Sequence, residues 1–261
     1  MIGIFDSGIG GLTVARAIMD RLPGYDIVYF GDTAHTPYGN KSVHTVINYA
    51  VADTKFLIDH GATIIVVACN TASSVAARVL SEKFKEPVLE VITPAVDAAI
   101  TSTKKGAIGV IGTRATISSG IYERKIMEKR PGTRVYQEPC PLLVPLVEEG
   151  WLKRPETNMI VKKYLLPLKT RQIDTLILGC THYPVLKRII AKKAGKNVAV
   201  VDSSIEMAKH VKQAVDSSAD IAKRLTKTGS IEFYVSDMTL RFEKTARMII
   251  GKSIRLTEVR G

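Results

Sequence analysis

Short runs of consecutive apolar residues alternate along the chain with longer stretches in which apolar residues recur every three or four positions. The short runs are rich in β-branched and aliphatic side chains, which predicts buried parallel strands, and the longer stretches predict amphipathic helices. In the first part of the chain we expect strands at 2–5, 26–30 and 63–68, and helices at about 11–22 and 42–60. This β-α-β-α-β order is typical of α/β proteins.

The same order begins again after Thr93-Pro94. Strands are expected at 107–111, 133–137 and 175–179, with helices at about 116–128 and between 143 and 168. Because the two halves repeat one plan, we predict an α/β fold of two similar lobes related by pseudo-twofold symmetry. Each lobe is expected to hold a mainly parallel sheet flanked by helices, with the functional site in the cleft between the lobes.

The remaining segments extend both lobes. A strand at 197–201 ends at Asp202-Ser203-Ser204, which predicts a capped helix at 205–215. The last part of the chain offers a strand at 230–235 and a helix at about 238–250, too little for a third domain. We therefore expect the chain to cross back, so that the first lobe comprises residues 1–97 and 208–261 and the second lobe residues 98–207.

Two cysteines stand at equivalent places in this plan. Cys69 closes the strand at 63–68, and Cys180 closes the strand at 175–179. Ligands of open α/β sheets bind outside the carboxyl ends of the strands, where a following helix N-terminus lowers a thiol pKa. Buried cysteines can also be plain core residues, but the polar pairs Asn70-Thr71 and Thr181-His182 that follow them are awkward in a core. We predict two thiols that face one ligand, whereas Cys140, between two prolines, is expected to be structural.

Two loops on the same predicted edge offer polar groups. Asp6-Ser7-Gly8-Ile9-Gly10-Gly11 opens a helix, so its amides could bind an anion the size of a carboxylate. It departs from the dinucleotide fingerprint at Thr13 and lacks a phosphate-loop lysine, and a tight glycine turn is the alternative interpretation. In the second loop, Tyr38 brings a hydroxyl and Gly39 an amide that could fix a small polar ligand, although the segment alone is an ordinary turn.

Composition narrows the possible partners. The chain of 261 residues carries 37 basic and 25 acidic residues, a net charge of +12, and such a surplus can attract nucleic acid. Because these lysines and arginines are scattered, without aromatic residues between them, we expect a solvated basic surface and no nucleic-acid binding. The five histidines show no paired ligand spacing and no Cys-x-x-Cys unit occurs, so we expect no metal site.

No apolar stretch approaches the roughly 20 residues that span a bilayer. Met1 leads directly into the first predicted strand, without a basic region or a cleavage site. We therefore expect a cytoplasmic protein without membrane attachment, whose three cysteines stay reduced.

Two thiols on opposite sides of a ligand fit few reactions. A cysteine hydrolase uses one thiolate with a histidine base, and a redox dithiol needs its sulfurs in bonding contact. Inversion of a carbon acid without a cofactor needs one base on one face of the carbon and one acid on the other. Two matching thiols therefore favour a racemase.

Five motifs support this interpretation when they are taken together: Phe5-Asp6-Ser7-Gly8-Ile9-Gly10-Gly11, Thr36-Pro37-Tyr38-Gly39, Ala68-Cys69-Asn70-Thr71-Ala72, Pro145-Leu146-Val147-Glu148-Glu149-Gly150 and Leu178-Gly179-Cys180-Thr181-His182-Tyr183-Pro184. With these motifs the chain resembles, nearly end to end, the glutamate racemases of the cofactor-independent aspartate/glutamate racemase superfamily. The resemblance implies interconversion of L- and D-glutamate without a cofactor, which supplies D-glutamate for peptidoglycan. It also implies a homodimer.

The resemblance further implies that Cys69 and Cys180 are the acid/base thiols, each serving one enantiomer as base and the other as acid. Asp6 would assist Cys69, and His182 with Glu148 would assist Cys180. Adjacent Glu149 could hold this role instead of Glu148. The alternative interpretation of the two glutamates is an ordinary pair of acidic surface residues. The residues implied to bind the substrate are Asp6, Ser7, Tyr38, Gly39, Asn70, Thr71, Thr181 and His182.

Two alternatives stay open at this point. The substrate could be aspartate or another small amino acid, although aspartate racemases tend to carry Glu where this chain has His182. A non-catalytic, two-lobed basic binding protein is the alternative from another class. Control by a peptidoglycan precursor is not expected, because the chain begins at its first strand without the N-terminal extension of some relatives.

Overall fold

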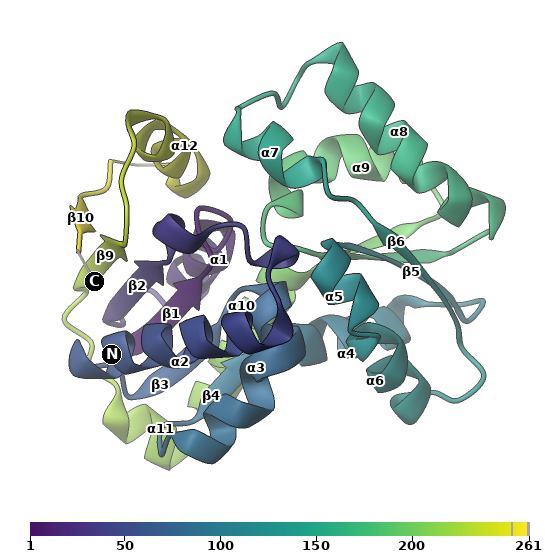
Figure 1. The fold of residues 1–261 in the computed structure, drawn as a ribbon. Helices are drawn as coiled ribbons and strands as arrows, with labels where there is room; N and C mark the ends of the chain where they lie inside the picture. Colours follow the sequence, from purple (N-terminus) through teal and green to yellow (C-terminus); the bar gives the residue numbers. More distant parts are fainter. Residues whose placement is uncertain (252, 260–261) are drawn as a thin grey trace.

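Two parallel sheets, each covered by helices, make up the two lobes of the molecule (Figure 1). The structure is a computed structural model and describes residues 1–251 and 253–259. Figure 1 shows the sheet that contains β1 on the left and the sheet that contains β5 on the right. The predicted α/β fold of two lobes is confirmed.

The first sheet has the strand order β10-β9-β2-β1-β3-β4, and its pairs are parallel. Its strands are β1 (Ile2–Asp6), β2 (Ile27–Gly31), β3 (Ile64–Val67), β4 (Val88–Glu90), β9 (Ile231–Val235) and β10 (Leu256–Glu258). Ile2 of the central strand pairs with Ile27 on one side and with Ile64 on the other. The C-terminal segment returns to this sheet, because β9 pairs with β2.

The second sheet has the order β6-β5-β7-β8 and is also parallel. Its strands are β5 (Ala107–Gly112), β6 (Arg134–Pro139), β7 (Thr175–Gly179) and β8 (Ala199–Asp202). This order repeats the β2-β1-β3-β4 part of the first sheet, strand for strand. The central strands β1, β3, β5 and β7 are buried along their whole length, as continuous apolar runs predict. The boundaries of the lobes, near residues 97 and 207, stay a prediction.

Helices cover both sheets. They are α1 (Leu12–Arg21), α2 (Val43–Asp59), α3 (Asn70–Lys83), α4 (Ile92–Ser102), α5 (Arg114–Ser118), α6 (Ile121–Lys129), α7 (Leu143–Glu148), α8 (Pro155–Thr170), α9 (Lys187–Ala194), α10 (Ser203–Ser217), α11 (Ala219–Arg224) and α12 (Leu240–Ile250). Short 3-10 helices span Thr33–His35, Tyr38–Asn40 and Tyr183–Leu186. As predicted, Asp202 caps α10 by accepting a hydrogen bond from the Ser204 amide.

The structure corrects the predicted elements at two places. Thr93-Pro94 lies in the first turn of α4, a helix that the sequence did not predict, where a proline costs no helical hydrogen bond and Glu90 accepts from the Thr93 amide. The helix expected at 116–128 is divided into α5 and α6, because Gly120 adopts a left-handed φ of 64°. The helices expected between 143 and 168 are confirmed as α7 and α8, and the second begins at Pro155.

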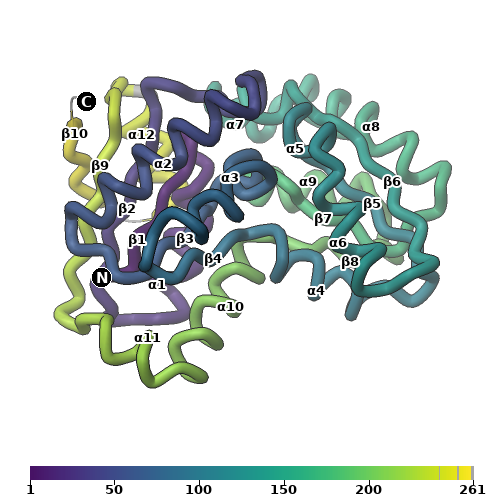
Figure 2. The backbone as a smooth tube through the Cα atoms, turned by 60° about the horizontal axis from the view of Figure 1, so that its bottom comes forward, coloured from purple at the N-terminus to yellow at the C-terminus, as the bar shows by residue number. Residues whose placement is uncertain are grey.

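The largest apolar core lies between the lobes rather than inside one of them. It joins β1 and α1 of the first lobe to residues of the second, including Ile126 and Ile177, with Met207 of α10. Helix α10 packs against both α1 and α4. In Figure 2, α4 and α10 lie where the lobes meet. The lobes therefore share a packed hinge on one side of the site.

Candidate functional site

Both predicted thiols are buried at the carboxyl ends of equivalent strands. Cys69 lies two residues after the end of β3, and Cys180 directly follows β7. Each is 5% exposed. The other site residues predicted from the sequence, apart from Gly39 and Glu148, are at most 7% exposed: Asp6, Ser7, Tyr38, Asn70, Thr71, Thr181 and His182. The thiols and these side chains are therefore shielded from solvent in this structure.

Cys69 is held at the start of a long helix. It is the N-cap of α3, and its sulfur accepts a hydrogen bond from the Ala72 amide at 3.4 Å. The Ser7 hydroxyl lies 3.6 Å from the same sulfur. Burial and the charge of Asp6 raise the pKa of Cys69 to about 12, against the opposing effects of the Ala72 amide and Ser7. Cys69 is therefore a neutral thiol at neutral pH.

Asp6 ends β1 beside Cys69 and reaches the other lobe. Its carboxylate accepts hydrogen bonds from the Gly8 amide at 3.0 Å and from the Thr181 hydroxyl at 3.1 Å. Burial raises the pKa of Asp6, although the charge of His182 and the hydrogen bonds act in the opposite direction. One carboxylate thus links the surroundings of the two thiols.

The glycines of the first loop make this close approach possible. A Cβ at Gly11 would lie 2.2 Å from Cβ of Asp6. A Cβ at Gly10 would lie 2.4 Å from Thr181 Oγ1 and 2.5 Å from His182 Nδ1. Any larger residue at position 10 would therefore push the Cys180 segment away from α1. The tight-turn interpretation of these glycines has direct support, whereas their binding of an anion stays a prediction.

Cys180 is supported by a relay of two side chains. His182 Nδ1 lies 3.8 Å from the Cys180 sulfur, and His182 Nε2 lies 3.1 Å from Glu148 Oε1. Burial lowers the pKa of His182, but the hydrogen bonds and charges of Cys180 and Glu148 outweigh it and raise the pKa to about 10. His182 is therefore an imidazolium at neutral pH. The structure brings Glu148, at the end of α7, to this histidine, as the resemblance implied.

Asn70 and Thr71 meet side chains of the second lobe that the sequence alone did not single out. The Tyr122 hydroxyl donates to Asn70 Oδ1 at 2.6 Å. Thr71 Oγ1 lies 2.9 Å from Thr113 Oγ1 and 3.2 Å from Thr116 Oγ1. A signal for Thr113 was available, because it follows β5 as Ser7 follows the equivalent strand β1.

Tyr38 directs its hydroxyl into the first lobe. The hydroxyl lies 2.6 Å from Asp32 Oδ2 and 2.8 Å from Asp53 Oδ2. A phenol has one proton to donate, so one of these two carboxyls must carry a proton of its own. Burial, followed by the charge of Asp32, raises the pKa of Asp53 well above its ordinary value, which identifies Asp53 as the protonated acid. The hydroxyl is thus already engaged, and a ligand contact from this loop would come from its backbone.

Gly39 brings the same loop against the second lobe. A Cβ there would lie 2.7 Å from Thr113 Cβ.

Cys140, the third cysteine, is fully buried in the core of the second lobe, and its carbonyl accepts a hydrogen bond from Tyr183. These contacts give Gly39 a packing role and are consistent with a structural Cys140.

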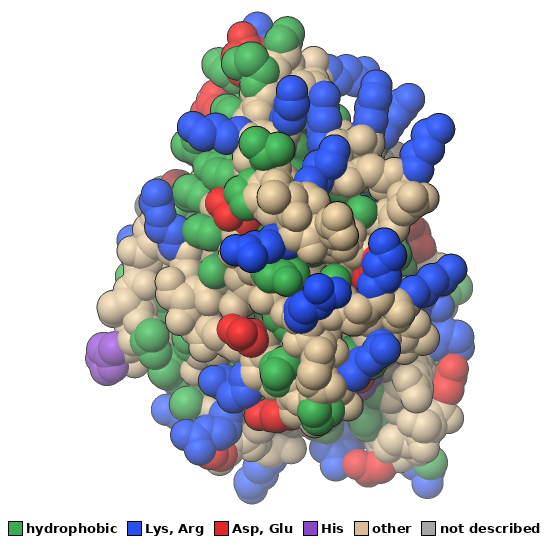
Figure 3. Space-filling view, turned by 90° about the vertical axis from the view of Figure 1, so that its right-hand side faces the viewer, with side chains coloured by type: hydrophobic (Ala, Val, Ile, Leu, Met, Phe, Trp, Pro, Cys, Tyr) green, Lys and Arg blue, Asp and Glu red, His purple; other side chains and the backbone are tan. Residues whose placement is uncertain are grey.

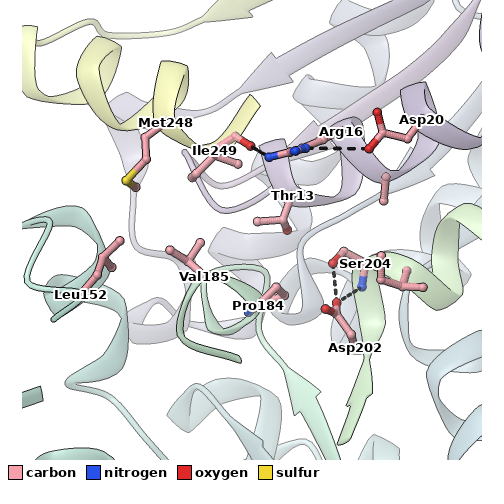
Figure 4. Close-up of a pocket in the computed structure, with 12 residues that line it drawn as sticks. Thr13, Arg16, Asp20, Leu152, Pro184, Val185, Asp202, Ser204, Met248 and Ile249 are labelled. Carbon is pink, nitrogen blue, oxygen red and sulfur yellow. Dashed lines mark hydrogen bonds and ion pairs between the residues drawn. The ribbon is translucent and has the colours of Figure 1, made fainter. Parts of the chain in front are cut away.

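A hollow of about 330 Å³ lies behind the Cys180 segment, between α1, α12 and the start of α10 (Figure 4). Thr13 lines it, and the Thr13 hydroxyl lies 2.9 Å from the Gly10 carbonyl and 3.0 Å from the Thr181 carbonyl, which share its one proton. The hollow does not include either reactive thiol. Thr13 therefore connects α1 of the first lobe to the residue that follows Cys180.

Other kinds of site have less support. Among residues 1–251 and 253–259, no group of three or more His, Cys, Asp or Glu side chains could hold a metal ion. Within the same part of the chain, no helix is long and apolar enough to cross a membrane. On the face seen in Figure 3, lysine and arginine side chains dominate the charged groups, and the interpretation as a solvated basic surface stays a prediction.

Comparison with known proteins identifies relatives over the whole chain. Residues 14–213 match the Asp/Glu/Hydantoin racemase family. The glutamate racemase of Persephonella marina is 47% identical over 258 residues, which cover 99% of this chain and 96% of that protein.

Two solved structures have the same fold. A glutamate racemase isoform from Bacillus anthracis superposes with a TM-score of 0.93 at 38% identity, covering 99% of this chain and 97% of the other. The glutamate racemase of Francisella tularensis, solved in complex with D-glutamate, has a TM-score of 0.90 at 39% identity, with 99% and 96% covered. The chain therefore belongs to the Asp/Glu/Hydantoin racemase family, and the resemblance to its glutamate racemases is confirmed.

Proposed function

We propose that the protein interconverts L- and D-glutamate by moving the Cα proton between two cysteine thiols. The observation that carries this proposal is the pair Cys69 and Cys180, buried at equivalent strand ends of facing lobes, each with its own titratable neighbours. The charge of Cys180 contributes to the raised pKa of Cys69, so the two sulfurs are near enough to interact. The similarity to glutamate racemases over nearly the full chain supports glutamate as the substrate.

The first proton transfer requires one thiolate and one thiol. The His182 imidazolium would stabilise a thiolate on Cys180, whereas Cys69 holds its proton at neutral pH. Cys180 then takes the Cα proton from one face of the substrate, and Cys69 donates its own proton to the opposite face. The product leaves Cys180 as the thiol and Cys69 as the thiolate, which is the arrangement that the reverse reaction needs.

The Cα proton of an amino acid is far less acidic than a thiol, so the site must stabilise the carbanion-like transition state. Closure over a dry site strengthens every hydrogen bond and charge inside it. We assign Asp6, Ser7, Asn70, Thr71, Thr181 and His182, with the backbone of Tyr38 and Gly39, to hold the substrate's carboxylates and ammonium. The buried positions of these residues support the assignment.

Exchange of the Cα proton in deuterated water tests the proposal directly. The purified protein, with no added cofactor, is incubated with L-glutamate, D-glutamate, or either enantiomer of aspartate, and deuterium at Cα is followed by NMR. We expect exchange and racemisation of both glutamate enantiomers, much faster than of aspartate. Absence of glutamate exchange would contradict the proposal, and faster exchange of aspartate would reassign the substrate.

The resemblance also leads us to propose a cytoplasmic homodimer that supplies D-glutamate for peptidoglycan. Sedimentation velocity on the purified protein should give about twice the chain mass of 28.5 kDa. Depletion of the protein in its own cell should be rescued by external D-glutamate. A monomer would refute the assembly, and a defect that D-glutamate leaves unchanged would refute the cellular role.

A further inference from the structure

Asn70 has one half of its amide satisfied and the other half without a partner. Its side-chain oxygen accepts a hydrogen bond from the Tyr122 hydroxyl at 2.6 Å. Among the described residues, none lies within hydrogen-bonding distance of Asn70 Nδ2, although the residue is only 2% exposed. A buried N–H donor without a partner destabilises the protein. Such a group in a closed site is typical of a donor that is kept for a ligand.

Tyr122 has a geometry suited to fixing that donor. It is fully buried in α6 of the second lobe, whereas Asn70 begins α3 of the first. Because the phenol donates to the amide oxygen, the amide is held with its nitrogen turned away from Tyr122. Without this contact the two ends of the amide could exchange places, and a carbonyl oxygen would then face a carboxylate substrate.

The ring of Tyr122 makes a second contact beside the other thiol. A Cβ at Gly179 would lie 3.1 Å from Tyr122 Cε2, so the ring packs directly on the residue before Cys180. One side chain therefore touches the residue that follows Cys69 and the residue that precedes Cys180. This position fixes the hydroxyl relative to both strand ends.

We propose that Tyr122 is a positioning residue that orients the Asn70 amide, so that Nδ2 donates a hydrogen bond to a carboxylate of glutamate. The inference rests on the racemase function proposed above. It predicts that loss of the phenol hydroxyl weakens substrate binding in the ground state and in the transition state alike. The effect should therefore appear in KM more than in kcat.

A double-mutant cycle on the full chain tests the inference, with Tyr122→Phe, Asn70→Ala and the combined variant. Tyr122→Phe is expected to raise KM for both enantiomers about 3- to 10-fold, the range for one lost hydrogen bond. In the Asn70→Ala background the same change should leave KM unaltered, because the group that Tyr122 orients is gone. Two effects that simply multiply would overturn the proposal.

A matched control and a second readout separate this outcome from failure of the racemase proposal. Tyr234→Phe removes a hydroxyl that donates to Glu232 in β9 and should leave KM unchanged. In ¹⁵N-labelled protein, the Asn70 side-chain NMR signals, assigned by their loss in Asn70→Ala, should shift on Tyr122→Phe whether or not the protein turns over. Unchanged signals would contradict the inference even in an active racemase. If Tyr122→Phe does not fold, D-glutamate added to the unaltered protein must shift the same signals, and no shift would overturn it.

Discussion

The two thiols occupy matching places in two matching sheets, yet their surroundings differ. Cys69 has a backbone amide at 3.4 Å, a serine hydroxyl at 3.6 Å and the Asp6 carboxylate nearby. Cys180 has an imidazolium at 3.8 Å, which is held in turn by Glu148. Burial and the Asp6 charge raise the pKa of Cys69 against the effects of the amide and Ser7, whereas the neighbour of Cys180 is a cation. The repeated fold therefore supplies the geometry, and the residues around each strand end supply the asymmetry.

The difference begins in the backbone. Helix α3 starts immediately after Cys69, so its first amides are directed at the sulfur. After Cys180 the chain first forms the short 3-10 helix Tyr183–Leu186, and α9 starts only at Lys187. No long helix N-terminus is available there, and the imidazolium of His182 provides the positive charge instead. The two cysteines therefore have different positive partners, backbone amides of α3 at Cys69 and the His182 side chain at Cys180.

Loss of either thiol should reduce the rate of racemisation most. Cys69→Ala and Cys180→Ala should each reduce racemisation to below about 1% of the unaltered protein, because a positioned acid or base contributes about 10²- to 10⁴-fold. Circular dichroism checks that the fold is kept, and Cys140→Ala is the matched control away from the ligand. Normal turnover in either variant would refute the two-thiol mechanism.

The pH dependence of kcat/KM should report on the surroundings of Cys180 and not on those of Cys69. The pKa of His182 is raised to about 10, so its imidazolium is present below that pH and is lost as pH rises through it. Activity that needs this cation should therefore fall on the alkaline side. Glu148→Gln removes one cause of the raised pKa and should shift the alkaline limb of the kcat/KM profile to lower pH.

Glu149→Gln is the control for this measurement, because it removes the same charge one residue further along the chain. We expect its alkaline limb to stay in place. A limb that moves in Glu149→Gln and not in Glu148→Gln would reverse the assignment of the two glutamates.

A smaller effect on kcat/KM is expected from a change at Thr13, which contacts the segment after Cys180 from α1. Thr13→Val keeps the shape of the side chain but removes the hydroxyl that lies between the Gly10 and Thr181 carbonyls. We expect kcat/KM to fall about 2- to 10-fold, the range for one hydrogen bond. Thr13→Ser keeps the hydroxyl and should retain activity. Equal losses in both variants would show that packing, and not the hydrogen bond, holds the segment.

Much of this comparison could be predicted from the sequence, because buried parallel strands are short apolar runs that end in visible polar residues. The positions of Cys69, Cys180 and Asp6 follow from that pattern. The division between α5 and α6 was missed, because the left-handed turn at Gly120 leaves the apolar pattern around it unbroken. Helix α4 was not predicted, because Thr93-Pro94 was interpreted as the end of the first half although proline also fits the first turn of a helix.

The partners across the cleft were beyond sequence reasoning. Tyr122 lies 52 positions from Asn70, and Thr13 lies 168 positions from Thr181. Such contacts depend on how the lobes pack, for which a single sequence has no local signal. The protonated Asp53 was missed for another reason, since only the fold within the first lobe brings it and Asp32 to one tyrosine hydroxyl.

Deuterium exchange in the two single-thiol variants tests the central claim most directly. Each variant, Cys69→Ala or Cys180→Ala, is incubated in deuterated water with L-glutamate and, separately, with D-glutamate, and Cα deuteration is followed by NMR. A thiol that reaches only one face of Cα can exchange only one enantiomer, with its configuration retained. We predict that the two variants exchange opposite enantiomers; preference of both variants for the same enantiomer would contradict two thiols on opposite faces of one carbon.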